Sequence, residues 1–151
     1  MSDEISPEKR EEIRKIVEKI NPKADLHFTA FLPRPLGKVS GKRLGLVMTS
    51  QSALPKAKEH LEKLGGAEVV ATSGNLSNRL KLREDLEKFR GIDAVAVELK
   101  AAAVDVVTKW ALERGGIGVI YLDNEPVNID GKDLRKSVLE LGKRVLGGRR
   151  P

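Results

Sequence analysis

The sequence predicts an α/β domain in which helices cover both faces of a mainly parallel sheet. From residue 42 onward, four short apolar runs alternate with amphipathic segments. The apolar runs are continuous and do not alternate with polar residues, which indicates strands that are buried on both faces. Successive β-α units join through right-handed crossovers and build a parallel sheet between two helical layers. We therefore expect a three-layer, Rossmann-like domain with four to five strands and an additional N-terminal helix.

The N-terminal segment is typical of a helix followed by an extended connector. Ser6-Pro7-Glu8 supplies a capping hydroxyl, a proline at the first helical position and an acid in the first turn. Residues 27–32 then form a candidate edge strand, and the prolines that follow keep the chain extended or turning. Apolar residues at i, i+3, i+4 and i+7 give this first helix one apolar face, and it should end near Asn21-Pro22: Ile13, Ile16, Val17 and Ile20.

Each of the four β-α units consists of an apolar run and the amphipathic segment after it. The expected strands are 43–49, 68–72, 93–98 and 117–122. The third helix should span 101–113, and the other three are defined by their apolar faces: Leu54, Ala57, Leu61 and Leu64; Leu82, Leu86 and Phe89; and Leu134, Val138, Leu141 and Val145. The predicted organisation is a helix over 1–22, an extended Pro-rich and basic connector over 23–41, the α/β domain over 42–146 and a basic tail over 147–151.

The amino-acid composition limits the classes of protein to which the chain can belong. The 151 residues suit one domain, and 40% hydrophobic with 33% charged residues indicates a globular chain. Cysteine is absent and there are two distant histidines, which argues against disulfides, thiolate metal sites and zinc. No apolar run approaches the ~18 residues of a membrane span, and the polar N-terminus is unlike a signal peptide, so we expect a cytoplasmic protein. One glutamine among many Lys, Arg and Glu residues is typical of a heat-loving source.

The net charge of +6 is concentrated in two short segments. Residues 34–43 and 143–150 each carry four basic residues and no acid, while the rest of the chain is nearly balanced. Such segments could meet phosphates, nucleic acid or an acidic protein surface, or could simply be solvated. None of the five aromatic residues interleaves with them, which weakens single-strand binding. The candidate basic patch comprises Arg34, Lys38, Lys42, Arg43, Lys143, Arg144, Arg149 and Arg150.

Polar residues follow each predicted strand, where open α/β sheets bind ligands. Hydroxyl residues that enter helix N-termini leave backbone N–H groups for an anion, and Arg or Lys beside them add charge. Simpler interpretations remain open: Ser52 and Ser77 would cap helices, Glu98 and Lys100 would pair with each other, and 123–126 would be a turn. The candidate ligand-binding residues are Ser77, Asn78, Arg79, Glu98, Lys100, Asp123 and Asn124.

No self-sufficient active site is evident in the sequence. The dinucleotide fingerprint G-x-G-x-x-G follows none of the strands. Residues 37–43 resemble a phosphate loop faintly, but the spacing between the glycines is wrong and the segment precedes a strand. No Ser-His-Asp set or carboxylate pair can be assembled. We therefore predict no catalytic residues, no metal site and no cofactor held by this chain.

Three strings occur in an order and spacing that resemble a known family. They are Ser77-Asn78-Arg79 with the segment after it, ELKAAAVDVV over 98–107, and DNEPV over 123–127. Together they resemble the C-terminal domain of archaeal cyclic 2,3-diphosphoglycerate synthetase, over about 41–130 with a weaker extension back to residue 31. The resemblance implies an enzyme that uses ATP and Mg²⁺ to close 2,3-bisphosphoglycerate into an intramolecular phosphoanhydride. It also implies a P-loop in an upstream domain, which this chain lacks.

Without a phosphate cradle, ligase-type activity would require a nucleotide-binding partner. The first hypothesis is therefore an accessory domain that binds a small phosphorylated acid and works with a P-loop partner. In it, Lys100 neutralises an anion, Glu98 orients Lys100, and Arg79 grips a second anionic group. A second hypothesis is an interaction or homodimerisation module that binds no small molecule. A third is a sequence-independent nucleic-acid binder, whose affinity would fall steeply with salt.

Overall fold

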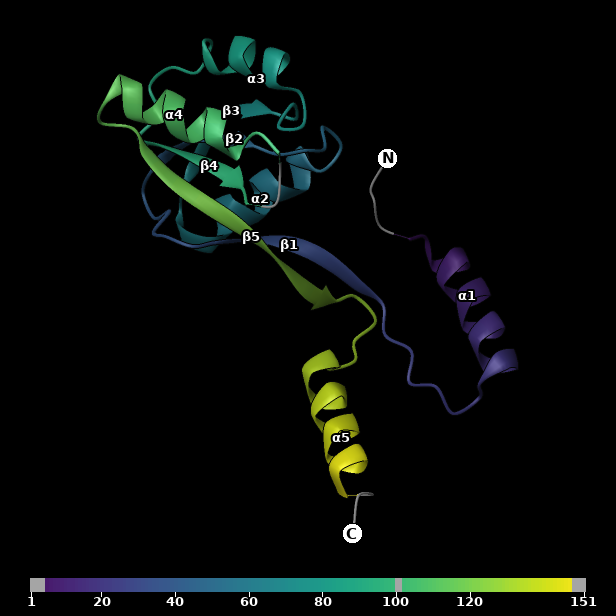
Figure 1. Ribbon diagram of the computed structural model, residues 1–151. Helices are drawn as coiled ribbons and strands as arrows, with labels where there is room; N and C mark the ends of the chain where they lie inside the picture. The colour runs from purple at the N-terminus through teal and green to yellow at the C-terminus, as the bar shows by residue number, and fades with distance from the viewer. Residues whose placement is uncertain (1–4, 100–101, 148–151) are drawn as a thin grey trace. The chain divides into compact units, whose positions relative to one another are not determined.

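The computed structural model describes residues 5–99 and 102–147 (Figure 1). Strands and helices alternate after the first helix, as the sequence predicts. In chain order the elements are α1 (Pro7–Ile20), β1 (Thr29–Pro35), β2 (Arg43–Val47), α2 (Leu54–Gly65), β3 (Glu68–Ser73), α3 (Arg79–Leu86), β4 (Ala94–Glu98), α4 (Val104–Arg114), β5 (Gly118–Asn128) and α5 (Leu134–Gly147). The predicted α/β class is confirmed.

The sheet has the strand order β1-β5-β4-β2-β3. The pairs β3–β2, β2–β4 and β4–β5 are parallel. Leu36 N donates to Tyr121 O at 2.8 Å and Ile129 N to Phe28 O at 3.0 Å, so β1 runs antiparallel to β5 at the edge of the sheet. The mainly parallel, Rossmann-like sheet is confirmed. Its topological switch point lies between β2 and β4, because the chain leaves β2 toward β3 and returns on the other side.

Successive residues of the central strands pack against different helices. In β4, Ala94 and Ala96 share an apolar cluster with residues of α2, whereas Val95 and Val97 share one with residues of α3 and α4. This alternation follows from the two-residue period of a strand and explains why the strand sequences are continuously apolar. Gly45 in β2 allows a close approach, since a Cβ there would lie 2.5 Å from Phe89 Cδ2. The described residues include no helix that is both long and apolar enough to cross a bilayer.

The chain divides into two compact units. The core unit spans Leu32–Glu125 and holds the helix-covered sheet. The helical unit combines the described residues 5–31 and 126–147, which include α1 and α5. This division differs from the expected α/β domain over 42–146 at both ends. The core unit begins earlier, within β1, and it does not include α5.

One expectation about the C-terminal third is wrong. Residues 123–126 are not a turn at a strand end, because β5 continues through them to Asn128. Beyond Leu122 the register with β4 stops while the pairing with β1 extends to Phe28 and Ile129, so non-local hydrogen bonds override a turn-like composition. The helix α5 belongs to the helical unit, and none of its residues is buried.

Candidate functional site

Glu98 joins the ends of two strands to a residue within a third, at the switch point. Its Oε2 accepts hydrogen bonds from Thr49 N at 2.9 Å and Thr49 Oγ1 at 2.7 Å, and its Oε1 accepts one from Asn124 Nδ2 at 3.2 Å. Thr49 follows β2, Glu98 ends β4, and Asn124 lies in β5. Burial raises the pKa of Glu98, but the hydrogen bonds from Thr49 and Asn124 outweigh burial and hold the pKa below its usual value. Glu98 is therefore a carboxylate at neutral pH.

The two helices that follow the switch-point strands begin without a side-chain cap. The N-cap residues of α2 and α4 are Ala53 and Ala103, and neither makes a side-chain cap hydrogen bond. The caps of α1 and α3, by contrast, are the polar side chains of Ser6 and Asn78. Backbone N–H groups at the start of an uncapped helix can bind water or an anion, and the helix dipole favours negative charge there. In α2, Pro55 contributes no N–H, so the donors at this end come from the residues around it.

The N-terminus of α2 is the better anion site of the two. Its first turn contains no acidic residue, whereas α4 carries Asp105 there. Ser52 does not cap α2, contrary to expectation, and its Oγ lies 2.8 Å from Ser50 Oγ. This arrangement places two hydroxyl groups and the uncapped amides in one loop, between the end of β2 and the start of α2.

The loop after β2 is held rigidly against the loop after β3. Met48 N donates to Ser73 O at 2.9 Å, and Leu76 N donates to Met48 O at 3.1 Å. Gly74 lies so close to Gln51 that a Cβ on Gly74 would be 2.7 Å from Gln51 Cα. The amides before α2 are therefore positioned by backbone contacts from a neighbouring strand, which is what preorganised anion binding requires.

Ser77, Asn78 and Arg79 lie at the start of α3. The side-chain hydrogen bonds of Asn78 and Arg79 go to residues other than Glu98, Thr49 and Asn124. Ser77 is not the cap of α3; Asn78 is, and its Oδ1 accepts from Lys81 N at 3.2 Å. Arg79 donates to both carboxylate oxygens of Asp105 at 2.9 Å and to Ala102 O at 2.9 Å. These contacts raise the pKa of Arg79 and lower that of Asp105. Arg79 thus joins α3 to the segment that begins α4.

A groove of about 480 Å³ lies beside this ion pair, between α3 and α4. The Arg114 guanidinium stacks over the Trp110 ring at 4.8 Å and also pairs with Glu87 at 2.6 Å. The charges that line the groove are therefore largely engaged with one another across the two helices. Sequence reasoning did not single out Asp105 or Thr49, although an acid in a first helical turn and a hydroxyl after a strand were both visible signals.

The remaining predicted residues are only partly brought together. Glu98 and Asn124 are in contact, while Asp123 Oδ2 pairs with Arg34 at 3.2 Å and Asp123 Oδ1 accepts from Asn124 N at 2.9 Å. Lys100 lies outside the described residues. The contacts of Glu98 and Asn124 nevertheless define one wall of the switch-point site.

The predicted basic residues are distributed over both units of the chain. Arg34 pairs with Asp123 near the carboxyl half of β5, whereas Arg43 begins β2 and pairs with Glu68 at 3.5 Å. Lys38 and Lys42 precede Arg43 in the chain, and Lys143 and Arg144 belong to α5 in the helical unit. Arg149 and Arg150 lie outside the described residues. Within the core unit, Arg34 and Arg43 therefore pair with acids on different strands.

The described residues contain no ready-made cluster of metal ligands. In that part of the chain no three His, Asp or Glu side chains come together as ligands. Gly41 has a φ of 66° in a turn that precedes β2, so the glycines of 37–43 do not form a loop between a strand and a helix. We therefore derive no step through Mg²⁺ or ATP from these residues.

A family model described as the cyclic 2,3-diphosphoglycerate synthetase C-terminal domain matches residues 35–125. The chain belongs to this family. The matched range coincides closely with the core unit, Leu32–Glu125, and includes the whole switch-point site. The resemblance that the sequence strings indicated is thereby confirmed.

Relatives named cyclic 2,3-diphosphoglycerate synthetase match almost the entire chain. The protein of Thermococcus kodakarensis is 91% identical over 149 residues, which are 99% of this chain and 34% of the relative. That of Pyrococcus furiosus is 47% identical over 146 residues, 97% and 33% of the two chains. That of Rubrobacter xylanophilus is 48% identical over 132 residues, 85% and 30% of the two chains. The chain therefore spans about a third of the length of these synthetases.

Proposed function

We propose that this chain is the phosphoglycerate-binding part of a cyclic 2,3-diphosphoglycerate synthetase and works with a P-loop partner that holds the nucleotide. The observation that carries the proposal is the uncapped N-terminus of α2 at the switch point of the sheet, inside the region that the family model matches. In open α/β sheets this is the place where anionic ligands bind.

The chemistry of the ligand fits this location. 2,3-Bisphosphoglycerate carries two phosphates and a carboxylate, so a site for it must supply N–H donors and cations. The amides before α2, together with the hydroxyls of Ser50 and Ser52, supply donors for one phosphate. Lys100, two residues beyond Glu98, supplies the positive charge for a second anionic group. Arg79 is engaged with Asp105, so its role in this proposal is to position the start of α4.

Glu98 is a positioning residue in this proposal. Its carboxylate is half-buried and is already hydrogen-bonded by Thr49 and Asn124, which fixes the spacing of the strand ends. A fixed negative charge at this point also favours a cation two residues later in the chain. ATP would supply the phosphoryl energy when bound by the partner, and no residue described here is assigned to that step.

Calorimetric titration with 2,3-bisphosphoglycerate tests the proposal. We expect saturable binding that persists at moderate salt, because fixed amides and not only mobile charges hold the ligand. Lys100→Ala should weaken binding at least about tenfold, as expected for loss of a charge-assisted contact. The matched control is Lys63→Ala, which removes an exposed lysine in the last turn of the same helix α2 and should leave affinity unchanged. Absence of binding by the unmodified chain would contradict the proposal.

A further inference from the structure

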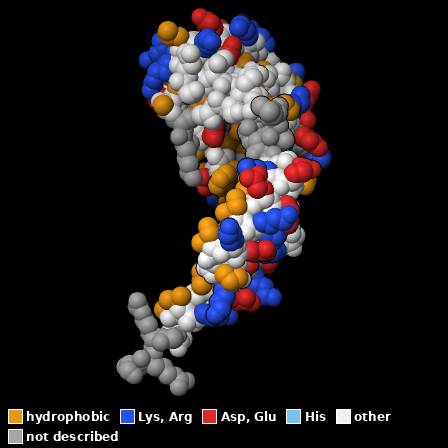
Figure 2. All heavy atoms as spheres, turned by 90° about the vertical axis from the view of Figure 1, so that its right-hand side faces the viewer, with side chains coloured by type: hydrophobic (Ala, Val, Ile, Leu, Met, Phe, Trp, Pro, Cys, Tyr) orange, Lys and Arg blue, Asp and Glu red, His pale blue; other side chains and the backbone are white. Residues whose placement is uncertain are grey.

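The helical unit exposes two apolar helix faces. Neither α1 nor α5 has a buried residue, although both carry aliphatic side chains at helical spacing. Ile20 of α1 is 80% exposed, and Leu141, Val145 and Leu146 of α5 are 55%, 56% and 71% exposed. Figure 2 shows apolar side chains at the surface over these helices, interspersed with charged ones. Exposed aliphatic residues gathered on one face indicate an interaction surface.

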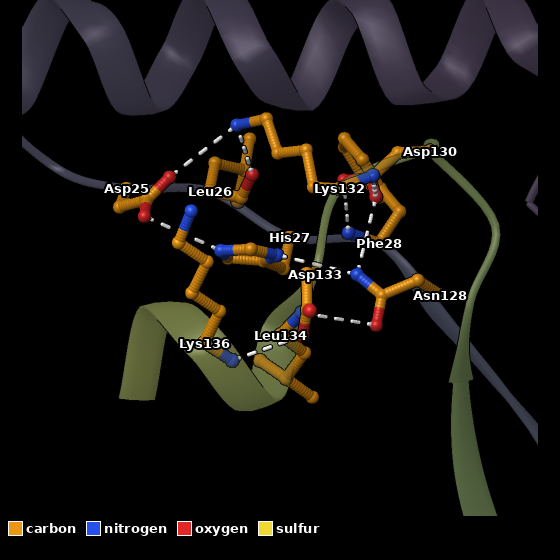
Figure 3. Close-up of polar contacts among 10 residues, drawn as sticks. All are labelled: Asp25, Leu26, His27, Phe28, Asn128, Asp130, Lys132, Asp133, Leu134 and Lys136. Atoms are coloured by element: carbon orange, nitrogen blue, oxygen red, sulfur yellow. Dashed lines mark hydrogen bonds and ion pairs between the residues drawn. The ribbon is translucent and has the colours of Figure 1, made fainter. Parts of the chain in front are cut away.

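The helical unit is nevertheless an ordered structure with a polar centre of its own (Figure 3). Asp130 Oδ2 accepts from Phe28 N at 2.9 Å, and Lys132 Nζ donates to Leu26 O at 2.8 Å. His27 lies between Asp25 and Asn128, with its ring nitrogens 3.3 Å from each. These contacts join the segment before β1 to the loop after β5.

Both helices are attached to this polar centre. Asn128 Oδ1 accepts from Leu134 N at 3.3 Å, and Asp133 Oδ1 accepts from Lys136 N at 2.9 Å, so the start of α5 is fixed. From α1, Arg10 donates to Ile129 O at 3.2 Å, and Arg14 lies over the Phe28 ring at 5.8 Å. The helices are thus held at one side, while their aliphatic faces stay open.

The comparisons indicate what covers these faces. The family model matches residues 35–125. Both segments of the helical unit, 5–31 and 126–147, therefore lie outside the matched range. The full synthetases nevertheless match the chain through both helices, over 97% to 99% of its length, and each is about three times as long. The helical unit therefore recurs in proteins that carry a large additional portion of chain.

We infer that the aliphatic faces of α1 and α5 dock onto the portion of a cyclic 2,3-diphosphoglycerate synthetase that this chain does not match. The identity of the occupant rests on the proposed function. Charge argues against a second copy of α5 as the occupant, because the helix carries Arg135, Lys136, Lys143 and Arg144 against Glu140 alone, a net of +3. Two such helices would repel, whereas a partner surface with acidic residues around an apolar strip would fit.

A chimera tests this docking with every part present. The matched 149 residues of the Thermococcus kodakarensis synthetase, which are 91% identical, are replaced by this chain. Hydrogen–deuterium exchange is then compared between the chimera and the separate chain. We expect amides of α1 and α5 to exchange at least about tenfold more slowly in the chimera, since docking suppresses local opening. Equal exchange in the two proteins would overturn the inference.

Paired variants distinguish docking from folding. Leu141→Gln with Val145→Gln should remove the added protection of α5 in the chimera and leave the circular dichroism of the separate chain unchanged, because both side chains are exposed there. The matched control is Leu80→Gln with Leu112→Gln, two exposed leucines of the core unit at 74% and 73%, which should have no effect on α5.

Two further outcomes remain informative. In the separate chain, the amides of α1 and α5 could exchange more slowly as the protein concentration is raised. That result would show that a second copy covers these faces and would overturn the inference. The proposed phosphoglycerate site lies in the core unit, so binding of 2,3-bisphosphoglycerate by the separate chain should not depend on α1 or α5. If the separate chain did not bind 2,3-bisphosphoglycerate but exchange still slowed in the chimera, only the proposed function would be contradicted. If the chain bound the ligand but exchange did not slow, only the docking would be contradicted.

Discussion

Glu98 and Thr49 are joined by two hydrogen bonds, from the backbone N of Thr49 at 2.9 Å and from its hydroxyl at 2.7 Å. Glu98 ends β4, and Thr49 lies two residues beyond the end of β2, on either side of the switch point. This carboxylate therefore links β4 to the loop after β2 at the edge where a ligand would enter. The same carboxylate accepts from Asn124, so the third strand is held as well.

Replacing Glu98 by Ala should lower the free energy of unfolding by about 1–2 kcal/mol at neutral pH, because the donors of Thr49 and Asn124 lose a charged acceptor. Glu98→Gln retains an acceptor oxygen and should cost less. Guanidinium chloride unfolding followed by circular dichroism measures both. Equal stability of the Ala variant and the unmodified chain would contradict the structural role of this carboxylate.

The contribution of Glu98 should also depend on pH. Its pKa in the folded chain is below the ordinary value of 4.5 for a glutamate. The stabilisation by the carboxylate is therefore fully present above that ordinary value and is lost as the pH falls through the lower folded-state pKa. The stability difference between the unmodified chain and Glu98→Gln should shrink in that acidic range. A difference that grows on acidification would mean that the carboxylate is not stabilised by its hydrogen bonds.

Gly74→Ala should destabilise the core unit by about 1–3 kcal/mol, because the added Cβ would lie 2.7 Å from Gln51 Cα and 2.8 Å from Gln51 N. Gly142→Ala is the matched control, since Gly142 lies in α5 with no atom within 4 Å of its Cβ position. That change should stabilise α5 by about 0.5–1 kcal/mol. Thermal unfolding measures the stability of both variants. If Gly74→Ala had the stability of the unmodified chain, the loops after β2 and β3 would not be packed closely.

Asp130→Ala should loosen the helical unit and spare the core unit. Asp130 accepts from the backbone N of Phe28 and of Lys132, and these bonds lower its pKa. Hydrogen exchange should therefore speed up at the amide of Phe28 and at the start of α5, while the amides of β2 and β4 stay protected. Glu84→Ala, an exposed acid on α3, is the control. Faster exchange throughout the sheet would instead mean that the two units unfold together.

The core of the fold is predictable from local sequence. Val95 to Val97 form a continuous apolar run because both faces of β4 are covered, and that signal needs no knowledge of the partner helices. The path of β5 through Asp123 and Pro126 is not predictable locally. Beyond Leu122 the register with β4 stops, and the pairing with β1, nearly a hundred residues away in sequence, decides the conformation.

The candidate site could be predicted only in part for a related reason. Glu98 and Asn124 were singled out as polar residues near strand ends, and they are in contact. The partnership of Glu98 with Thr49 depends on strand order, which single-sequence patterns do not encode. The amphipathic pattern of α5 likewise predicts an apolar face but not the surface that covers it.

Amide chemical shifts test the location of the proposed site most directly. The chain labelled with ¹⁵N is titrated with 2,3-bisphosphoglycerate, and backbone amides are followed by nuclear magnetic resonance. We predict that the largest shifts occur at Ser50, Gln51 and Leu54, where the uncapped start of α2 meets the end of β2. Shifts confined to the basic residues 34–43 and 143–147, or no saturable shifts at all, would contradict a phosphoglycerate site at the switch point.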